Sequence, residues 1–121
     1  MSRIRIALAL VAVVAVAAFG VGSALGANPK LTGTVGPDSS FTIKLTAVGK
    51  AVKSLKPGKV TILVKDTAAI HNFHLTGPGI NKKTSVGGKG TFTWVLTLKK
   101  GKYTFVCDPH STTMKGSFIV K

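Results

Sequence analysis

Apolar and polar residues alternate with a period of two along most of the chain after residue 30, the pattern of half-buried β-strands. In the clearest run, Phe92, Trp94, Leu96 and Leu98 alternate with threonines over residues 91–98. Turn signals rich in Gly, Pro, Asp, Ser or Lys separate such runs, and no run has the 3.6-residue period of a helix. The expected strands lie at residues 31–35, 41–46, 60–65, 70–76, 91–98, 103–107 and 116–120. The pattern therefore predicts an all-β sandwich or barrel of about seven or eight strands.

The first 27 residues do not follow this pattern. Arg3 and Arg5 precede an unbroken apolar run over residues 6–19, and small residues then continue to Ala27. A short basic region, an apolar core and a small-residue end are typical of an export signal. Val21 and Leu25 lengthen the run towards the roughly 20 residues of a membrane-spanning helix. We expect residues 1–27 to form a signal peptide or an N-terminal membrane anchor helix, with cleavage favoured by the small residues, and residues 28–121 to form an exported, periplasmic domain.

The charge is strongly positive, with a formal net value of +14 for the whole chain. Residues 28–121 hold all 15 lysines and all three aspartates but no arginine, so their net charge is +12. Lysine ammonium groups are hydrated point charges that suit diffuse attraction to acidic partner proteins or anionic surfaces. Aromatic residues do not interleave the lysines as they do in nucleic-acid binders. We therefore expect an acidic redox partner and no nucleic acid.

Sulfur and imidazole groups gather near the C-terminus. Cys107, His110 and Met114 lie within eight residues, and Cys107 is the sole cysteine. Exported domains usually use cysteines in pairs, so a lone thiol indicates a free or ligated group. Two histidines, one cysteine and a weak axial methionine form the ligand set of a blue-copper electron-transfer site. The second imidazole is either His71 or His74. Residues three apart on a strand face opposite ways, so only one of the two can reach the site.

Three segments carry a resemblance to a known family: His71-Asn72, the run 103–110 (YTFVCDPH) and Met114-Lys115-Gly116. They resemble the cupredoxins, small blue copper proteins such as plastocyanin, pseudoazurin and amicyanin, over the whole exported region. The resemblance implies a Greek-key sandwich, one copper ion, one-electron transfer without enzymatic activity, and a monomer. It also implies four copper ligands: His71, Cys107, His110 and Met114.

The resemblance has further implications for the surroundings of the copper. The side chain of Asn72 would tie the two ligand loops together, and the ring edge of His110 would reach the surface through an apolar patch. Residues 77–80 are our candidates for that patch. Asp108 stands where plastocyanins have a small hydroxyl residue. Its carboxylate would either repel its surroundings or be tied up by Lys115, and it would lower the reduction potential if ionised near copper.

Two other functions fit parts of the sequence. A copper delivery protein would use the same ligands, but such proteins are often rich in additional Met and His, which this chain lacks. A metal-free adhesion module would leave the lone thiol unexplained. A zinc hydrolase would lack a glutamate as general base, because the sequence contains none. Three histidines are also too few for a multicopper oxidase, and one cysteine is too few for a binuclear copper centre.

Overall fold

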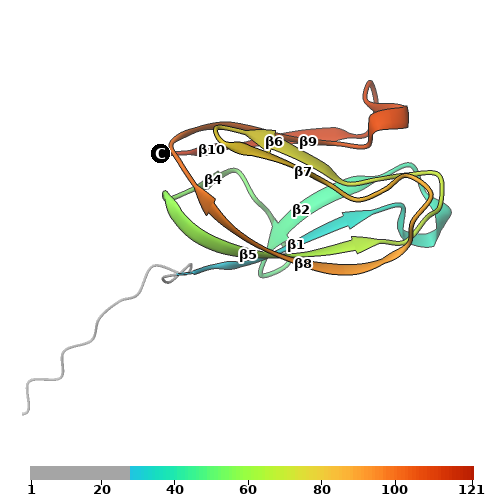
Figure 1. Cartoon of the computed structure of the whole chain (residues 1–121), viewed down its shortest axis with the longest axis horizontal. Helices are drawn as coiled ribbons and strands as arrows, with labels where there is room; N and C mark the ends of the chain where they lie inside the picture. The colour runs from blue at the N-terminus through green and yellow to red at the C-terminus, as the bar shows by residue number, and fades with distance from the viewer. Residues whose placement is uncertain (1–27) are drawn as a thin grey trace, which may run out of the picture.

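The computed structural model describes residues 28–121, which form two five-stranded β-sheets packed face to face (Figure 1). The expected N-terminal helix and the boundary at residue 27 lie outside the described residues. The elements are β1 (Lys30–Val35), η1 (Pro37–Ser39), β2 (Ile43–Ala47), β3 (Lys50–Ala51), β4 (Ser54–Leu55), β5 (Gly58–Asp66), β6 (His74–Gly77), β7 (Ile80–Lys83), β8 (Gly90–Leu98), β9 (Gly101–Val106), η2 (Asp108–His110) and β10 (Lys115–Val120). Within this part of the chain, no helix is long and apolar enough to cross a membrane.

The chain crosses repeatedly between the two sheets. One sheet has the order β3-β2-β1-β5-β8 and the other the order β4-β10-β9-β6-β7. Strands β1 and β5 pair in parallel, as do β10 and β4, and the remaining pairs are antiparallel. The prediction of an all-β sandwich is confirmed.

The strand count and one boundary differ from the expectation. The described region has ten strands. Two of the additional strands, β3 and β4, have only two residues each and lie in a lysine-rich segment without alternation. The third, β7, pairs with β6 although its residues are mostly exposed. Residues 70–73, expected as the start of a strand, instead form the loop before β6. Cross-strand pairing creates these short edge strands, and alternation along the sequence does not reveal them.

The core lies between the sheets and consists of the inward-facing residues of both. Tyr103 stacks on Phe118, with ring centroids 5.2 Å apart, and Phe73 stacks on Phe105 at 5.7 Å. Gly77 leaves room for the Tyr103 ring, because a Cβ at residue 77 would lie 2.2 Å from that ring. Large aromatic pairs of this kind supply much of the buried apolar area. The other fully or nearly fully buried apolar residues include Leu31, Val35, Leu45, Val60, Ile62, Val64, Leu75, Trp94, Leu98, Met114 and Val120.

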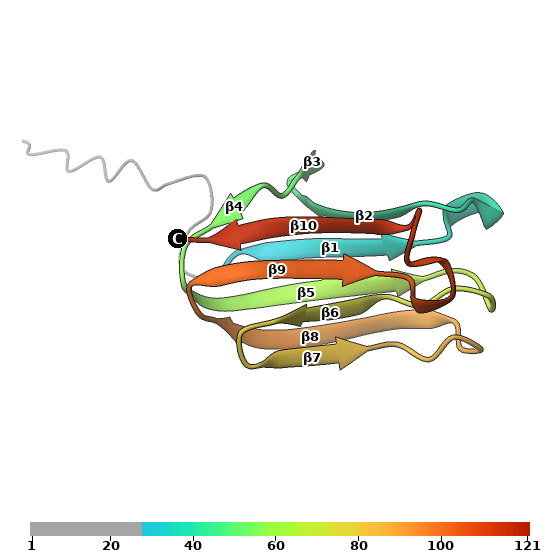
Figure 2. The same ribbon diagram turned by 90° about the horizontal axis from the view of Figure 1, so that it is seen from above.

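The strands run along the long axis, so the connecting loops gather at the two ends of the sandwich (Figure 2). One end, at the right in Figure 2, holds the β1–β2, β5–β6, β7–β8 and β9–β10 connections. The other end, at the left, holds the β4–β5, β6–β7 and β8–β9 connections. The candidate site occupies the first of these ends.

Candidate metal centre

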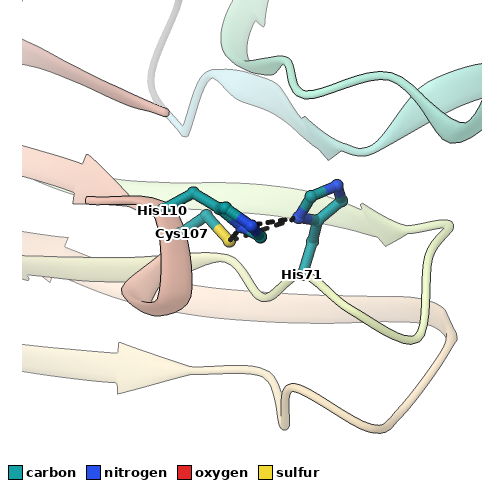
Figure 3. Close-up of side chains that lie close together, drawn as sticks. All are labelled: His71, Cys107 and His110. Carbon is teal, nitrogen blue, oxygen red and sulfur yellow. Dashed lines mark hydrogen bonds between the residues drawn. The ribbon is translucent and has the colours of Figure 1, made fainter. Parts of the chain in front are cut away.

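Three of the four predicted ligands meet at one end of the sandwich. The Nδ1 atoms of His71 and His110 are 3.1 Å apart, and each lies 3.5 Å from the Cys107 Sγ atom. Figure 3 shows the three side chains pointing toward one another. One ligand atom from each residue lies within 4.8 Å of the others. Residues 36 positions apart in sequence therefore form one compact cluster.

The three distances fit the coordination shell of a first-row transition metal ion. Bonds of about 2.0 Å to nitrogen and about 2.3 Å to sulfur place the ligand atoms of a tetrahedral shell roughly 3.3–3.6 Å apart. The observed separations of 3.1, 3.5 and 3.5 Å are close to these values. Thiolate with two imidazoles is a donor set that copper accepts in both of its common oxidation states.

The segment between β9 and β10 folds back on itself through its own backbone. The His110 N–H donates to the Cys107 carbonyl at 3.0 Å, and the Met114 N–H donates to the His110 carbonyl at 2.8 Å. The Cys107 N–H donates to the Met114 carbonyl at 3.0 Å, which closes the loop at its base. These bonds hold Cys107 and Met114 beside each other, and both side chains are buried. Cys107 continues the inward face of β9 beyond Tyr103 and Phe105, as its spacing predicts.

His71 reaches the cluster from the loop between β5 and β6. Its backbone N–H donates to the Ala68 carbonyl at 3.2 Å, and its side chain is fully buried. Gly36 packs against the ring, since a Cβ at that residue would lie 2.8 Å from His71 Cδ2 and the φ angle there is +68°. Phe41 packs edge-on against His71 and His110, with centroid distances of 5.1 and 4.9 Å. Contacts on several sides therefore fix the orientation of the imidazole.

His74 lies outside the cluster and points to a different set of partners. Its Nδ1 donates to Asp108 Oδ1 at 2.8 Å, and its Nε2 faces Asn81 Oδ1 at 2.6 Å. His71 and His74 do face different ways, as the spacing implies, but only His74 belongs to a strand. The geometric premise that both lie on one strand is therefore wrong.

An amide and a carboxylate join the two ligand loops. The Asp108 N–H donates to Asn72 Oδ1 at 2.7 Å, and Asn72 Nδ2 donates to Asp108 Oδ2 at 2.7 Å. Asn72 is buried and also donates to the Thr84 carbonyl at 3.3 Å. The structure thus shows the tie between the loops that the resemblance implies. Of the two alternatives for Asp108, the pairing with Lys115 is wrong, because the ion pair of Asp108 is with His74.

Several residues around the centre carry no signal in the sequence. Thr84, which directly follows β7, is buried; its hydroxyl donates to Asp66 Oδ2 at 2.7 Å and accepts from the Phe73 N–H at 2.9 Å. Burial raises the pKa of Asp66 more than the Thr84 hydrogen bond lowers it. Gly36 and Phe41 lie in the β1–β2 connection; Gly36 approaches His71, and Phe41 contacts both His71 and His110. Their roles depend on contacts between segments distant in sequence, which no local pattern encodes.

The surface next to His110 differs from the expected one. Residues 77–80 form the β6–β7 turn. Strand β6 begins near Cys107, because His74 pairs with Val106, and it runs away from Cys107, because Thr76 pairs with Thr104. The turn therefore lies at the opposite end of the sandwich (Figure 2), and its assignment to the apolar patch is wrong. The exposed apolar residues at the end that holds the metal centre, called the metal end below, include Phe41, which contacts His110, Ile70, which adjoins His71, and Val86 in the β7–β8 connection.

The ion pair between His74 and Asp108 should make stability depend on pH. Burial lowers the pKa of His74, but its hydrogen bonds to Asp108 and Asn81 and the charge of Asp108 outweigh that effect and raise it above 6.5. A histidine whose pKa is higher in the folded state than in the unfolded state stabilises the fold when it is protonated. This stabilisation is complete at pH values below the unfolded-state pKa, and it is lost as the pH rises through the folded-state pKa. We expect His74→Gln to cost about 1 kcal/mol near pH 6 and less near pH 9. Urea unfolding of both metal-free proteins at the two pH values measures this difference, and an equal cost at both would contradict it.

A two-sheet Greek-key sandwich with one nitrogen-and-sulfur metal site at its end defines a class of small mononuclear metalloproteins. Residues 38–121 match the family model described as copper binding proteins of the plastocyanin/azurin family. The chain belongs to this family, which is that of the cupredoxins. As a member with a His-Cys-His cluster, it is a type 1 copper protein that binds one copper ion and carries single electrons. Members of the family are generally electron carriers rather than enzymes, and they exchange electrons with partner proteins.

Solved structures with a similar fold include those of rusticyanin. A structure of reduced rusticyanin has a TM-score of 0.53 and 19% sequence identity, and covers 79% of this chain and 81% of that chain. Rusticyanin from Thiobacillus ferrooxidans has a TM-score of 0.51 and 21% identity, and covers 79% of each chain. At these identities the likeness supports the fold alone. No curated protein matches the sequence.

Proposed function

We propose that His71, Cys107, His110 and Met114 hold the copper ion. The observation that carries this proposal is the convergence of two Nδ1 atoms and one Sγ atom at separations of 3.1–3.5 Å. Support for Met114 comes from its burial and from the hydrogen bond that joins its carbonyl to the Cys107 N–H. Bound copper supplies reversible one-electron oxidation and reduction. The thiolate and thioether favour Cu(I), whereas the imidazoles accept both oxidation states.

The surrounding residues keep these ligands in place. Asn72 and Asp108 fasten the His71 loop to the Cys107 loop through two hydrogen bonds of 2.7 Å. Gly36 and Phe41 confine the His71 ring. Ligands that are fixed in this way move little when the charge of the site changes. A small reorganisation favours rapid electron exchange.

The route for electrons follows the ring of His110. This residue is half-buried, and the exposed side chains of Phe41 and Ile70 surround the site at the same end. A partner that docks on this apolar face approaches the ligand cluster more closely than one that docks elsewhere. Lys65, Lys83 and Lys89 lie at the same end and favour an acidic redox partner.

The protein would work outside the cytoplasmic membrane. The basic, apolar and small-residue pattern of residues 1–27 supports export, either as a cleaved signal or as an anchor. Residues 28–121 would then form the whole working domain, as a monomer.

A titration of the purified protein with Cu(II) tests the copper function. We expect binding of one equivalent, an intense blue absorption and a reversible one-electron wave in voltammetry. Weak, pale and exchangeable binding would instead support a copper delivery protein. Absence of binding would support an adhesion module and refute the proposal.

Ile70→Asp should slow electron self-exchange between copies of the protein by about tenfold without bleaching the copper. Ile70 is 55% exposed and adjoins His71. When two copies meet through this apolar face, the new carboxylate would lose its water, which opposes the contact. Ile119→Asp is a matched control, because Ile119 is 42% exposed on β10 near the opposite end and the change in net charge is identical. NMR line broadening in mixtures of the two oxidation states measures the rate. Equal slowing in both variants would show that net charge, and not the face, sets the rate.

A further inference from the structure

Lysines without acidic neighbours cover the end of the sandwich opposite the metal centre. Lys99 and Lys100 form the β8–β9 turn, and Lys102 follows as the second residue of β9. Lys56 lies in the β4–β5 connection, and Lys59 is the second residue of β5. Gly58 pairs with Leu98, so the two turns are neighbours. Lys53 is close by, because its carbonyl accepts from the N–H of Ile119, which pairs with Lys102. We call this surface the basic end; its exposed residues are Lys53, Lys56, Lys59, Lys99, Lys100 and Lys102.

The acidic side chains of residues 28–121 lie at the other end. Asp38 is in the β1–β2 connection, Asp66 ends β5, and Asp108 follows Cys107. The lysines at the metal end therefore have acidic neighbours, whereas the basic end has none among the described residues. In the described part of the chain, no lysine forms a salt bridge with any carboxylate. The charges of the basic end are available to an external partner.

The distance between the two ends separates the basic end from electron transfer. Strand β5 runs from one end to the other, and its nine residues span about 30 Å. Figure 2 shows the β8–β9 turn and the Cys107–His110 loop at opposite ends of β9. A redox protein bound at the basic end would lie too far from His110 for direct transfer.

The chain outside the structure joins the domain at this same end. The Pro29 carbonyl accepts from the Thr61 N–H, and β1 runs from Lys30 towards the metal end. The 27 preceding residues include the apolar run 6–19. The chain that carries this run is therefore joined to the domain at the end that holds the lysines.

We propose that the basic end docks on an anionic lipid bilayer and leaves the metal centre facing the aqueous phase. Lysines near an anionic surface each contribute about 1 kcal/mol of attraction, and hydrated ammonium groups need no fixed geometry for it. In the uncleaved chain, the apolar run of residues 6–19 adds its own attraction to the bilayer. This inference is independent of the proposed copper ligands.

The test compares two charge-matched variants of the full chain on vesicles. One variant carries Lys99→Gln, Lys100→Gln and Lys102→Gln at the basic end. The other carries Lys65→Gln, Lys83→Gln and Lys89→Gln at the metal end, so that both lose three positive charges. Co-sedimentation measures partitioning onto phosphatidylcholine vesicles with and without phosphatidylglycerol. The visible spectrum of the copper-loaded variants reports separately on the metal centre.

We expect the original chain to prefer anionic over neutral vesicles, and the basic-end variant to bind anionic vesicles roughly 100-fold more weakly. The metal-end variant should lose less than about tenfold, and binding to neutral vesicles should be the same for all three. Equal losses in the two variants would overturn the proposal in favour of diffuse attraction. The absence of any preference for anionic lipid would also overturn the proposal. If the basic end binds an acidic polypeptide such as polyglutamate but not vesicles, its partner is a protein and the proposal is wrong.

Discussion

Replacing Cys107 by serine should abolish the intense blue absorption of the copper-loaded protein and weaken copper binding by more than about 100-fold. The absorption of a blue copper site arises from the thiolate, and a hydroxyl is a harder, weaker ligand that stays protonated at neutral pH. Cys107 is fully buried and its Sγ lies 3.5 Å from each Nδ1 atom of the cluster. No other thiol in the chain could replace it.

The effect on folding should be much smaller than the effect on colour. Serine is close to cysteine in size, and a buried hydroxyl with imperfect partners costs about 1–3 kcal/mol. Visible absorption and copper titration give the main result, and far-ultraviolet circular dichroism verifies the β-fold. Ser111→Ala, an exposed change in the same loop, is the control and should keep the colour. A blue Cys107→Ser protein would refute the assignment of the thiolate.

Glutamine substitutions at the two histidines near β6 should have opposite outcomes. His71→Gln should destroy the blue site, because His71 Nδ1 is part of the cluster and no other imidazole can move into its buried position. His74→Gln should keep the blue site, because the His74 ring bonds to Asp108 and Asn81 outside the cluster. The two variants carry the same chemical change three residues apart, so each is the control for the other.

The measurements are the visible spectrum, the copper affinity and the unfolding midpoint of each variant. We expect His71→Gln to lose at least about 100-fold in affinity, and His74→Gln to lose less than about tenfold. Unfolding of the metal-free proteins separates loss of the ligand from loss of the fold, because glutamine has nearly the volume of histidine. Retention of the blue band in His71→Gln, with its loss in His74→Gln, would reverse the ligand assignment.

The connection between the ligand loops bears on both experiments. Asn72 and Asp108 form a closed pair of hydrogen bonds between the His71 loop and the Cys107 loop. Burial raises the pKa of Asp108, but the hydrogen bonds from His74 and Asn72 and the charge of His74 outweigh it, and the result lies below the usual value. The carboxylate is therefore ionised at neutral pH and keeps both contacts. A histidine outside the metal cluster thus helps to hold the loop that carries three of the proposed ligands, Cys107, His110 and Met114.

The sequence alone was sufficient to predict the fold class and the chemistry of the centre. Alternation in residues 91–98 and 103–107 predicts strands because side chains on a strand alternate between core and solvent, and these strands are present as β8 and β9. The lone Cys107 beside His110 and Met114 indicates copper because soft sulfur and imidazole donors suit that metal. Both inferences depend on local properties, which a linear sequence contains in full.

The tertiary structure decided what depends on residues distant in sequence. It grouped His71 with Cys107 and His110, directed His74 to Asp108, and placed Gly36 and Phe41 against the two imidazoles of the cluster. It moved residues 77–80 away from His110, because the pairing of β6 with β9 sets which turn lies at which end. It also separated the lysines of the basic end from the aspartates, which a net charge cannot reveal. Strand register and the packing of one sheet on the other determine these contacts, and neither is encoded in the periodicity of any single segment.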